Sequence, residues 1–215
     1  MIRRYDCSDP AARDAGITDA LRAIRNSELI VLPTDTVYGI GADAFSGTGI
    51  NALLAAKGRG RDMPVPVLVG NATALHGLVD MVPQPALDLV DAFWPGGLTL
   101  VLKHAPALAW DLGETRGTVA VRMPLHPVAL ELLTQAGPLG VSSANRSGAA
   151  PAISADEAQD QLGESVSVYL DGGVAAGQVP STIVDLTGLH PRLLRAGAVS
   201  LEALRGVLAD FEVPA

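Results

Sequence analysis

The segment Lys57-Gly-Arg59-Gly-Arg61 places three cations close together in the sequence. Arginine offers paired N–H donors to phosphate oxygens and lysine offers a compact positive charge, so this segment could bind a triphosphate. The same cations could instead complement the dipole at the C-terminal end of a solvated helix. The glycines favour the binding interpretation slightly, because a solvated helix end does not require them.

Polar clusters follow or precede several apolar runs. Thr34-Asp35-Thr36 and Ser142-Ser143-Ala-Asn145 offer hydroxyl and amide groups, and Ser181 opens another apolar run. Taken one at a time, such clusters are more often turns whose side chains bond their own backbone. Arg122 and Arg195 each end a predicted strand, and together they suggest an anion pocket.

Several standard motifs are missing from the sequence. It contains no GxxxxGK[ST] loop, no GxGxxG between a strand and a helix, and no GxSxG. The four histidines are far apart and Cys7 is the only cysteine, so we expect neither a protein metal cage nor an internal disulfide.

The polar clusters must be positioned by interleaved helices and strands. Caps and apolar periodicity predict a twisted mixed sheet with helices packed on it, in one domain over residues 1–215. Tyr5 and Cys7 are predicted to lie in a frayed terminus. The predicted helices cover 9–26, 49–57, 72–79, 85–93, 127–135, a segment from 154 and 200–208. The predicted strands cover 28–32, 65–69, 98–103, 118–122, 139–141, 166–170, 182–186 and 192–194.

Composition limits the class of protein. Hydrophobic residues make up 48% of the chain, which allows a packed core, and the formal net charge is −8. A negative charge of this size argues against a protein that coats nucleic acid. The sequence shows neither a secretory signal nor a long apolar run, so we expect a cytoplasmic protein without a membrane span.

Read in order, the motifs resemble the YrdC-like family of threonylcarbamoyl-AMP synthases. The stretches that carry the resemblance are PTDTVYGIGADAF at 33–45, Lys57 with Arg59, WPGGLTLVL at 94–102, TVAVRMPLHP at 118–127, SSANRSG at 142–148, DGG at 171–173, STIVDL at 181–186 and LLRAGAVS at 193–200. They span nearly the whole chain, which makes the resemblance specific.

The resemblance implies an open, twisted α/β fold with a large basic cavity. It implies a nucleotidyltransferase that makes threonylcarbamoyl-AMP and pyrophosphate from L-threonine, bicarbonate or carbon dioxide, and ATP with Mg²⁺. The product would pass to a tRNA threonylcarbamoyltransferase that forms threonylcarbamoyladenosine (t6A). Such chemistry joins two anions, so cations and hydrogen-bond donors matter more in it than a tuned acid or base.

The resemblance also implies roles for individual residues. Lys57, Arg59, Ser143 and Asn145 would form the catalytic set. Threonine would contact Thr36, Arg122, Ser143 and Ser181. The nucleotide would contact Lys57, Arg59, Met63, Thr118, Asn145 and Arg195.

The sequence departs from the family at Gly60, where relatives have proline, and near Met63 and Leu68, where they often have asparagine and histidine. Longer relatives have a C-terminal domain, which we expect this protein to lack. Two alternatives stay open: a module of this fold that binds tRNA or double-stranded RNA weakly, without synthase activity, and a carbamoyl-adenylate module like that of hydrogenase-maturation carbamoyltransferases. The net charge counts against the first alternative, and the single cysteine against the second.

Overall fold

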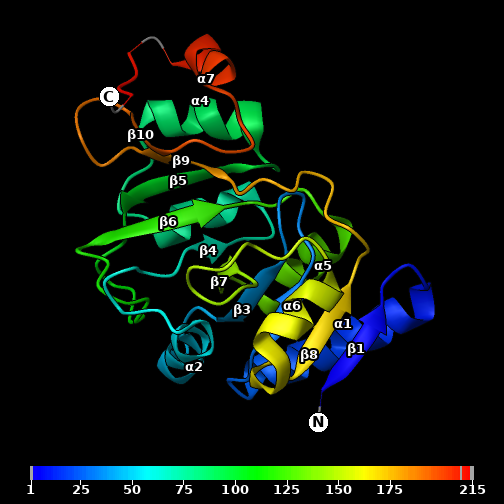
Figure 1. The fold of residues 1–215 in the computed structure, drawn as a ribbon. Coiled ribbons are helices and arrows are strands. Elements are labelled where there is room, and N and C mark those ends of the chain that lie inside the picture. Colours follow the sequence, from blue (N-terminus) through cyan, green and yellow to red (C-terminus); the bar gives the residue numbers. More distant parts are fainter. Residues whose placement is uncertain (1, 209, 214–215) are drawn as a thin grey trace.

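A ten-stranded sheet forms the centre of the computed structural model, which describes residues 2–208 and 210–213 (Figure 1). The strand order is β1-β8-β2-β3-β7-β4-β6-β5-β9-β10, with β1–β8, β2–β8, β4–β6 and β5–β9 parallel and the other neighbours antiparallel. The strands are β1 Arg3–Asp6, β2 Ile30–Leu32, β3 Gly39–Asp43, β4 Val67–Leu68, β5 Leu98–Lys103, β6 Thr118–Arg122, β7 Leu139–Ser143, β8 Val168–Asp171, β9 Thr182–Asp185 and β10 Arg192–Arg195. The predicted mixed sheet is confirmed.

Local signals start and stop the helices. The Asp9 carboxylate accepts the Ala12 N–H at the start of α1, and the Ser46 hydroxyl accepts the Gly49 N–H at the start of α2. Gly58 ends α2 in the left-handed region, at φ 61°. The helices are α1 Pro10–Arg25, α2 Gly47–Lys57, α3 Leu75–Leu78, α4 Gln84–Phe93, α5 Pro127–Ala136, α6 Ala155–Leu162 and α7 Leu201–Val207, with 3₁₀ turns at Ala72–Ala74 and Gly163–Ser165. No helix in these ranges is long and apolar enough to cross a bilayer.

Two apolar clusters cover the sheet. One joins α1 and α5 to side chains such as Leu139 and Val141 of β7. The larger cluster contains residues of α2, α4 and α6, and Figure 1 shows α4 and α7 next to each other near β9 and β10. Because side chains alternate along a strand, the register of β7 decides which of its serines faces which cluster.

The prediction of a frayed N-terminus is wrong. Strand β1 pairs in parallel with β8, with Arg3 opposite Val168. The Tyr5 hydroxyl donates to Asp19 over 2.9 Å, and Cys7 is buried. Four mostly polar residues carry no local strand signal, and their partner strand lies far along the chain, so no short sequence window could reveal β1.

Strand β3 is also absent from the prediction, which has no helix or strand between the strand over 28–32 and the helix over 49–57. Glycines weaken strand signals, yet here they are needed for packing. A Cβ on Gly39 would lie 2.6 Å from Cγ1 of Val141. The strand forms because β2 and β7 bind its two edges.

Candidate active site

Helix α2 delivers Lys57 to the loop that follows β7. The side chain is buried, and its ammonium donates to the Ser143 carbonyl, to the Asn145 carbonyl over 2.7 Å and to Asn145 Oδ1 over 3.3 Å. All three N–H bonds of the ammonium therefore have acceptors. Burial, with a smaller contribution from Arg59, lowers the pKa of Lys57 to about 8. In this structure Lys57 fixes the loop and adds a positive charge beneath it.

Arg59 lies two residues beyond Lys57, after the left-handed turn at Gly58. Its Nη1 donates to the Ser142 hydroxyl over 3.1 Å, while its Nε is buried and has no partner among the described residues. Burial lowers the pKa of Arg59, and Asp62 partly opposes that shift. A desolvated guanidinium with an unused donor is suited to an incoming anion.

The two serines of β7 face opposite sides of the sheet. Val141 packs in the cluster of α1 and α5. Side chains two residues apart in a strand point to the same face, so the Ser143 side chain points to that side of the sheet as well. Ser142 is buried on the other side and meets Arg59. Ser143 contributes its carbonyl to Lys57, so Ser142 is a candidate site hydroxyl that the family pattern did not single out.

Asn145 is committed to its own loop. Its Nδ2 donates to the carbonyls of Arg146, over 2.9 Å, and Ala149, over 2.8 Å, while its Oδ1 accepts from Lys57. We call Lys57, Arg59, Ser142 and Asn145 the phosphate-side cluster, after the phosphate-binding role that the family resemblance predicts for Lys57 and Arg59.

Arg122, at the end of β6, anchors a second group. Only 6% of the residue is exposed. Its Nε donates to the Gly96 carbonyl over 2.8 Å, its Nη1 to the Thr36 hydroxyl over 2.8 Å and its Nη2 to Asp35 over 2.6 Å. Burial lowers the pKa of Arg122, and the neighbouring Asp35 carboxylate opposes that shift.

Ser181 and Arg195 lie beside this arginine. Arg195 donates to the Ser181 carbonyl over 2.8 Å and to its hydroxyl over 3.0 Å, and the Ser181 hydroxyl bonds the Thr99 hydroxyl over 2.7 Å. Arg195 is exposed as a residue, but its guanidinium packs on Ser181, and this partial burial, with repulsion from Arg59, lowers its pKa. We define Thr36, Thr99, Arg122 and Ser181 as the amino-acid-side cluster, after the threonine contacts that the family resemblance predicts for Thr36, Arg122 and Ser181. Arg195 lies against this cluster through Ser181.

The two clusters are electrostatic neighbours. Burial is the main cause that lowers the pKa of Arg195, and the charge of Arg59 lowers it further. Burial is likewise the main cause that lowers the pKa of Arg122, and the charge of Arg195 makes a smaller contribution. Strand pairing agrees with this repulsion. Gly39, three residues after the Thr36 that bonds Arg122, lies opposite Ser143, whose carbonyl bonds Lys57.

Two of the predicted nucleotide contacts lie further out. Met63 is 42% exposed on the loop beyond Arg59. Thr118 begins β6, at the opposite end from Arg122, and its hydroxyl donates to the Thr115 carbonyl over 2.8 Å. Strand alternation places Thr118 on the same face of β6 as Arg122, so a long ligand could reach both.

Comparison with known proteins identifies the family. The sequence model of the Sua5/YciO/YrdC family, described as telomere recombination, matches residues 22–197. The chain belongs to this family. It is 57% identical to a putative threonylcarbamoyl-AMP synthase of Mycobacterium tuberculosis, over 97% of this chain and 96% of that protein. It is 35% identical to the threonylcarbamoyl-AMP synthase of Bacillus subtilis, over 94% of this chain and 59% of that protein.

Solved structures of the family share the fold. P. abyssi Sua5 complexed with L-threonine superposes with a TM-score of 0.92 at 33% identity, covering all of this chain and 62% of that one. E. coli YciO superposes with a TM-score of 0.81 at 25% identity, over 95% of this chain and 98% of that one. The chain therefore matches a short family member along its whole length and longer members over part of theirs.

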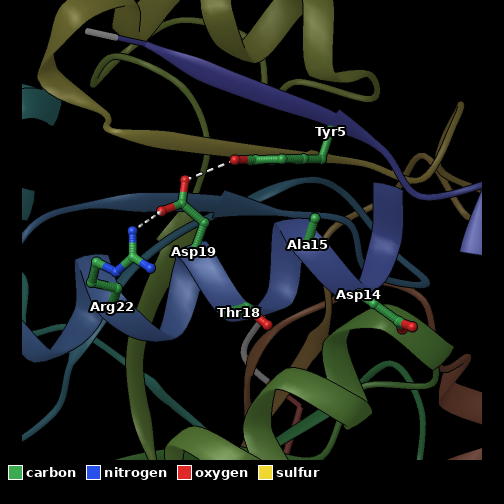
Figure 2. A pocket seen from close by; sticks show the side chains of 6 residues that line it. All are labelled: Tyr5, Asp14, Ala15, Thr18, Asp19 and Arg22. Atoms are coloured by element: carbon green, nitrogen blue, oxygen red, sulfur yellow. Dashed lines mark hydrogen bonds and ion pairs between the residues drawn. The ribbon is translucent and has the colours of Figure 1, made fainter. Parts of the chain in front are cut away.

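A hollow of about 370 Å³ elsewhere in this Sua5/YciO/YrdC domain lies between β1 and α1 (Figure 2). Asp19 there accepts the Tyr5 hydroxyl and pairs with Arg3 over 2.9 Å and with Arg22 over 3.4 Å. The hollow is lined by Tyr5, Asp14, Ala15, Thr18, Asp19 and Arg22. None of these residues belongs to either cluster. The Arg3–Asp19 ion pair and the Tyr5–Asp19 hydrogen bond fasten β1 to α1, while the Arg22–Asp19 pair lies within α1.

Thr99 is a site residue that the sequence analysis missed, because it looks like one more strand residue in LTLVL. It is 3% exposed, and its hydroxyl meets Ser181. Thr99→Val keeps the shape of the side chain and leaves the Ser181 hydroxyl with one buried partner fewer. We expect KM for the amino-acid substrate to rise about three- to tenfold, from the loss of one hydrogen bond. Steady-state kinetics would measure this KM. Thr99→Ser keeps the hydroxyl and should show the wild-type KM. An unchanged KM for Thr99→Val would contradict the prediction.

The lowered pKa of Lys57 predicts pH-dependent nucleotide binding in this family member. The ammonium loses its charge as pH rises through about 8, so attraction for a triphosphate is present below that pH and falls above it. Calorimetric titration with ATP from about pH 7 to about pH 10 should show Kd rising above the break. Lys57→Arg should move the break upward. An ATP affinity that stays constant through this range would contradict the prediction.

Proposed function

We propose that this chain is a threonylcarbamoyl-AMP synthase, a nucleotidyltransferase that joins L-threonine, bicarbonate or carbon dioxide, and ATP. One observation carries the proposal. Within residues 2–208 and 210–213, Lys57 and Arg59 have no carboxylate within 4.0 Å, although acidic residues outnumber basic ones in the chain by 23 to 15. Buried charges without a partner are costly, and a polyanionic substrate would supply the missing charge.

The two clusters correspond to the two halves of the reaction. Arg122, with Thr36 and Ser181 beside it, would hold the carboxylate and hydroxyl of threonine. Arg59, Ser142 and Arg195 would hold the phosphates, over the charge of Lys57. Thr118 and Met63 would contact the nucleoside end of ATP.

The geometry suits a reaction between two anions. The amine of threonine adds to carbon dioxide and loses a proton, which gives a carbamate. A carbamate oxygen then attacks the α-phosphorus of ATP, the bond to the β-phosphate oxygen breaks, and pyrophosphate leaves. The cations reduce the repulsion between carbamate and triphosphate and align the two groups, which is the main requirement of phosphoryl-type transfer.

Partners and cofactors follow from this chemistry. The described residues contain no group of three or more His, Cys, Asp or Glu side chains that could hold a metal ion. In this proposal Mg²⁺ arrives with ATP, as part of the substrate. The product would be consumed by a tRNA threonylcarbamoyltransferase in the cytoplasm, for t6A formation. Residues 1–215 would act as one domain, and the net charge weighs against the RNA-binding alternative.

The test is product analysis with the purified chain. ATP, bicarbonate and a panel of amino acids are supplied in turn, pyrophosphate is measured, and the nucleotide product is weighed by mass spectrometry. We expect pyrophosphate release that requires both L-threonine and bicarbonate, and a product with the mass of threonylcarbamoyl-AMP. Pyrophosphate release that is indifferent to threonine would overturn the proposal.

A further inference from the structure

Asp35 stands at the junction of three segments around the amino-acid-side cluster. It lies in the loop between β2 and β3, and its Oδ1 accepts the Leu125 N–H over 2.8 Å, from the segment between β6 and α5. Its carbonyl accepts the Gly177 N–H over 3.0 Å, from the segment between β8 and β9. The Leu125 bond orients the carboxylate and the Gly177 bond holds the backbone of Asp35, and neither bond involves Arg122.

Arg122 is in turn held at each of its three nitrogens. Gly96 and Thr36 supply neutral acceptors, and Asp35 supplies the one charged acceptor, over 2.6 Å. A guanidinium has five N–H bonds, so two stay available to a ligand. With 8% of its side chain exposed, Arg122 cannot obtain a substitute for Asp35 from bulk water.

We propose that Asp35 is a positioning residue for the amino-acid substrate: it fixes the Arg122 guanidinium so that the two remaining N–H bonds meet the substrate carboxylate together. The inference rests on the proposed function, since it assumes that Arg122 binds that carboxylate. Bidentate recognition depends on the orientation of the fork, and a fork held at all three nitrogens loses little freedom on binding.

The direction in which the affinity for the amino acid changes, when Asp35 is removed, distinguishes a positioning role from a purely electrostatic one. Asp35 is negative and lies against the group that would bind a carboxylate, so by charge alone its removal should tighten binding of the amino acid. If Asp35 acts by positioning Arg122, its removal should weaken that binding although the local positive charge increases.

The experiment compares Asp35→Asn and Asp35→Ala with Asp185→Asn in the whole chain. Asp185 is a matched control, because it also accepts a backbone N–H, from Thr187 over 2.9 Å, and an arginine, Arg192 over 3.0 Å. KM for L-threonine, KM for ATP and kcat are measured for each, with ATP binding as the check of folding.

We expect Asp35→Ala to raise KM for L-threonine by about ten- to a hundredfold, with KM for ATP within about twofold. Asp35→Asn, which keeps the size of the side chain and one acceptor oxygen, should show a smaller rise in the same direction, and Asp185→Asn should leave all three constants near wild type. If Asp35→Ala fails to fold, the Asn variant alone decides. An unchanged or lowered KM for threonine in a variant that binds ATP normally would overturn the proposal.

The wild-type enzyme distinguishes the two possible failures. If it releases no pyrophosphate in response to threonine, the proposed function fails. If it does so, and the Asp35 variants keep their affinity for threonine, then only the positioning role fails.

Discussion

Replacing Arg59 with alanine should lower kcat/KM for ATP by about two to three orders of magnitude while the protein stays folded. Arg59 is half-buried, has no carboxylate partner among the described residues, and keeps a buried Nε without an acceptor. Such a group gains its full hydrogen bonding only when an anion binds, so its loss affects the reaction more than the fold.

Arg61 provides the matched control for this variant. It lies on the same loop, but it bonds Asn51 over 2.9 Å and pairs with Asp111 on the surface. Exposed ion pairs contribute little to stability, and this arginine is already neutralised, so Arg61→Ala should change kcat/KM for ATP by less than about threefold. Initial rates of pyrophosphate release and thermal melting curves check both variants. Equal losses in the two variants would mean that the loop, and not Arg59, is what matters.

The second large effect is expected on the threonine side. Arg122→Ala should lower kcat/KM for L-threonine by about three orders of magnitude, because it removes the guanidinium that Gly96, Thr36 and Asp35 hold together. Arg122→Lys keeps the charge and loses the fork, so a loss of about ten- to a hundredfold is expected for it.

Folding must be separated from binding in this experiment. Arg122→Ala leaves Asp35 without its counter-ion, and breaking a buried pair costs about 3–5 kcal/mol. The Lys variant is therefore the more informative one, and its ATP affinity, measured without threonine, reports whether the phosphate-side cluster is intact. A Lys variant with wild-type KM for threonine would argue against carboxylate binding by Arg122.

The contacts of Lys57 modify the role that the family pattern predicts for it. The pattern assigns it to phosphate binding, and its place beside Arg59 agrees with a role in the same region. In the structure, however, each of its N–H bonds already has an acceptor in Ser143 or Asn145. Its contribution to nucleotide binding would therefore be its charge and the shape of the loop, which is why the pH dependence tests it better than deletion does.

The serine pair of β7 shows a different limit. The motif SSANRSG marks the segment, but neighbouring residues of a strand point to opposite sides. Only the packing of Val141 with α1 and α5, and the contact of Ser142 with Arg59, decide which hydroxyl faces the phosphate-side cluster.

What the sequence determined by itself is the set of features whose physical causes lie within a few residues. The cap at Asp9, the left-handed C-terminal residue Gly58 and the cap at Ser154 each act within one helical turn. The helices that begin or end at these residues can therefore be predicted from the sequence. Strand β5 and strand β6 follow from their apolar runs in the same way.

The tertiary structure alone decided the features that depend on distant partners. Strand β1 exists because β8 pairs with it, β3 because β2 and β7 bind its edges, and Asp35 matters because it meets Arg122. A hydrogen bond between residues more than eighty positions apart leaves no trace in a short window of sequence, since neither residue's local pattern requires the other.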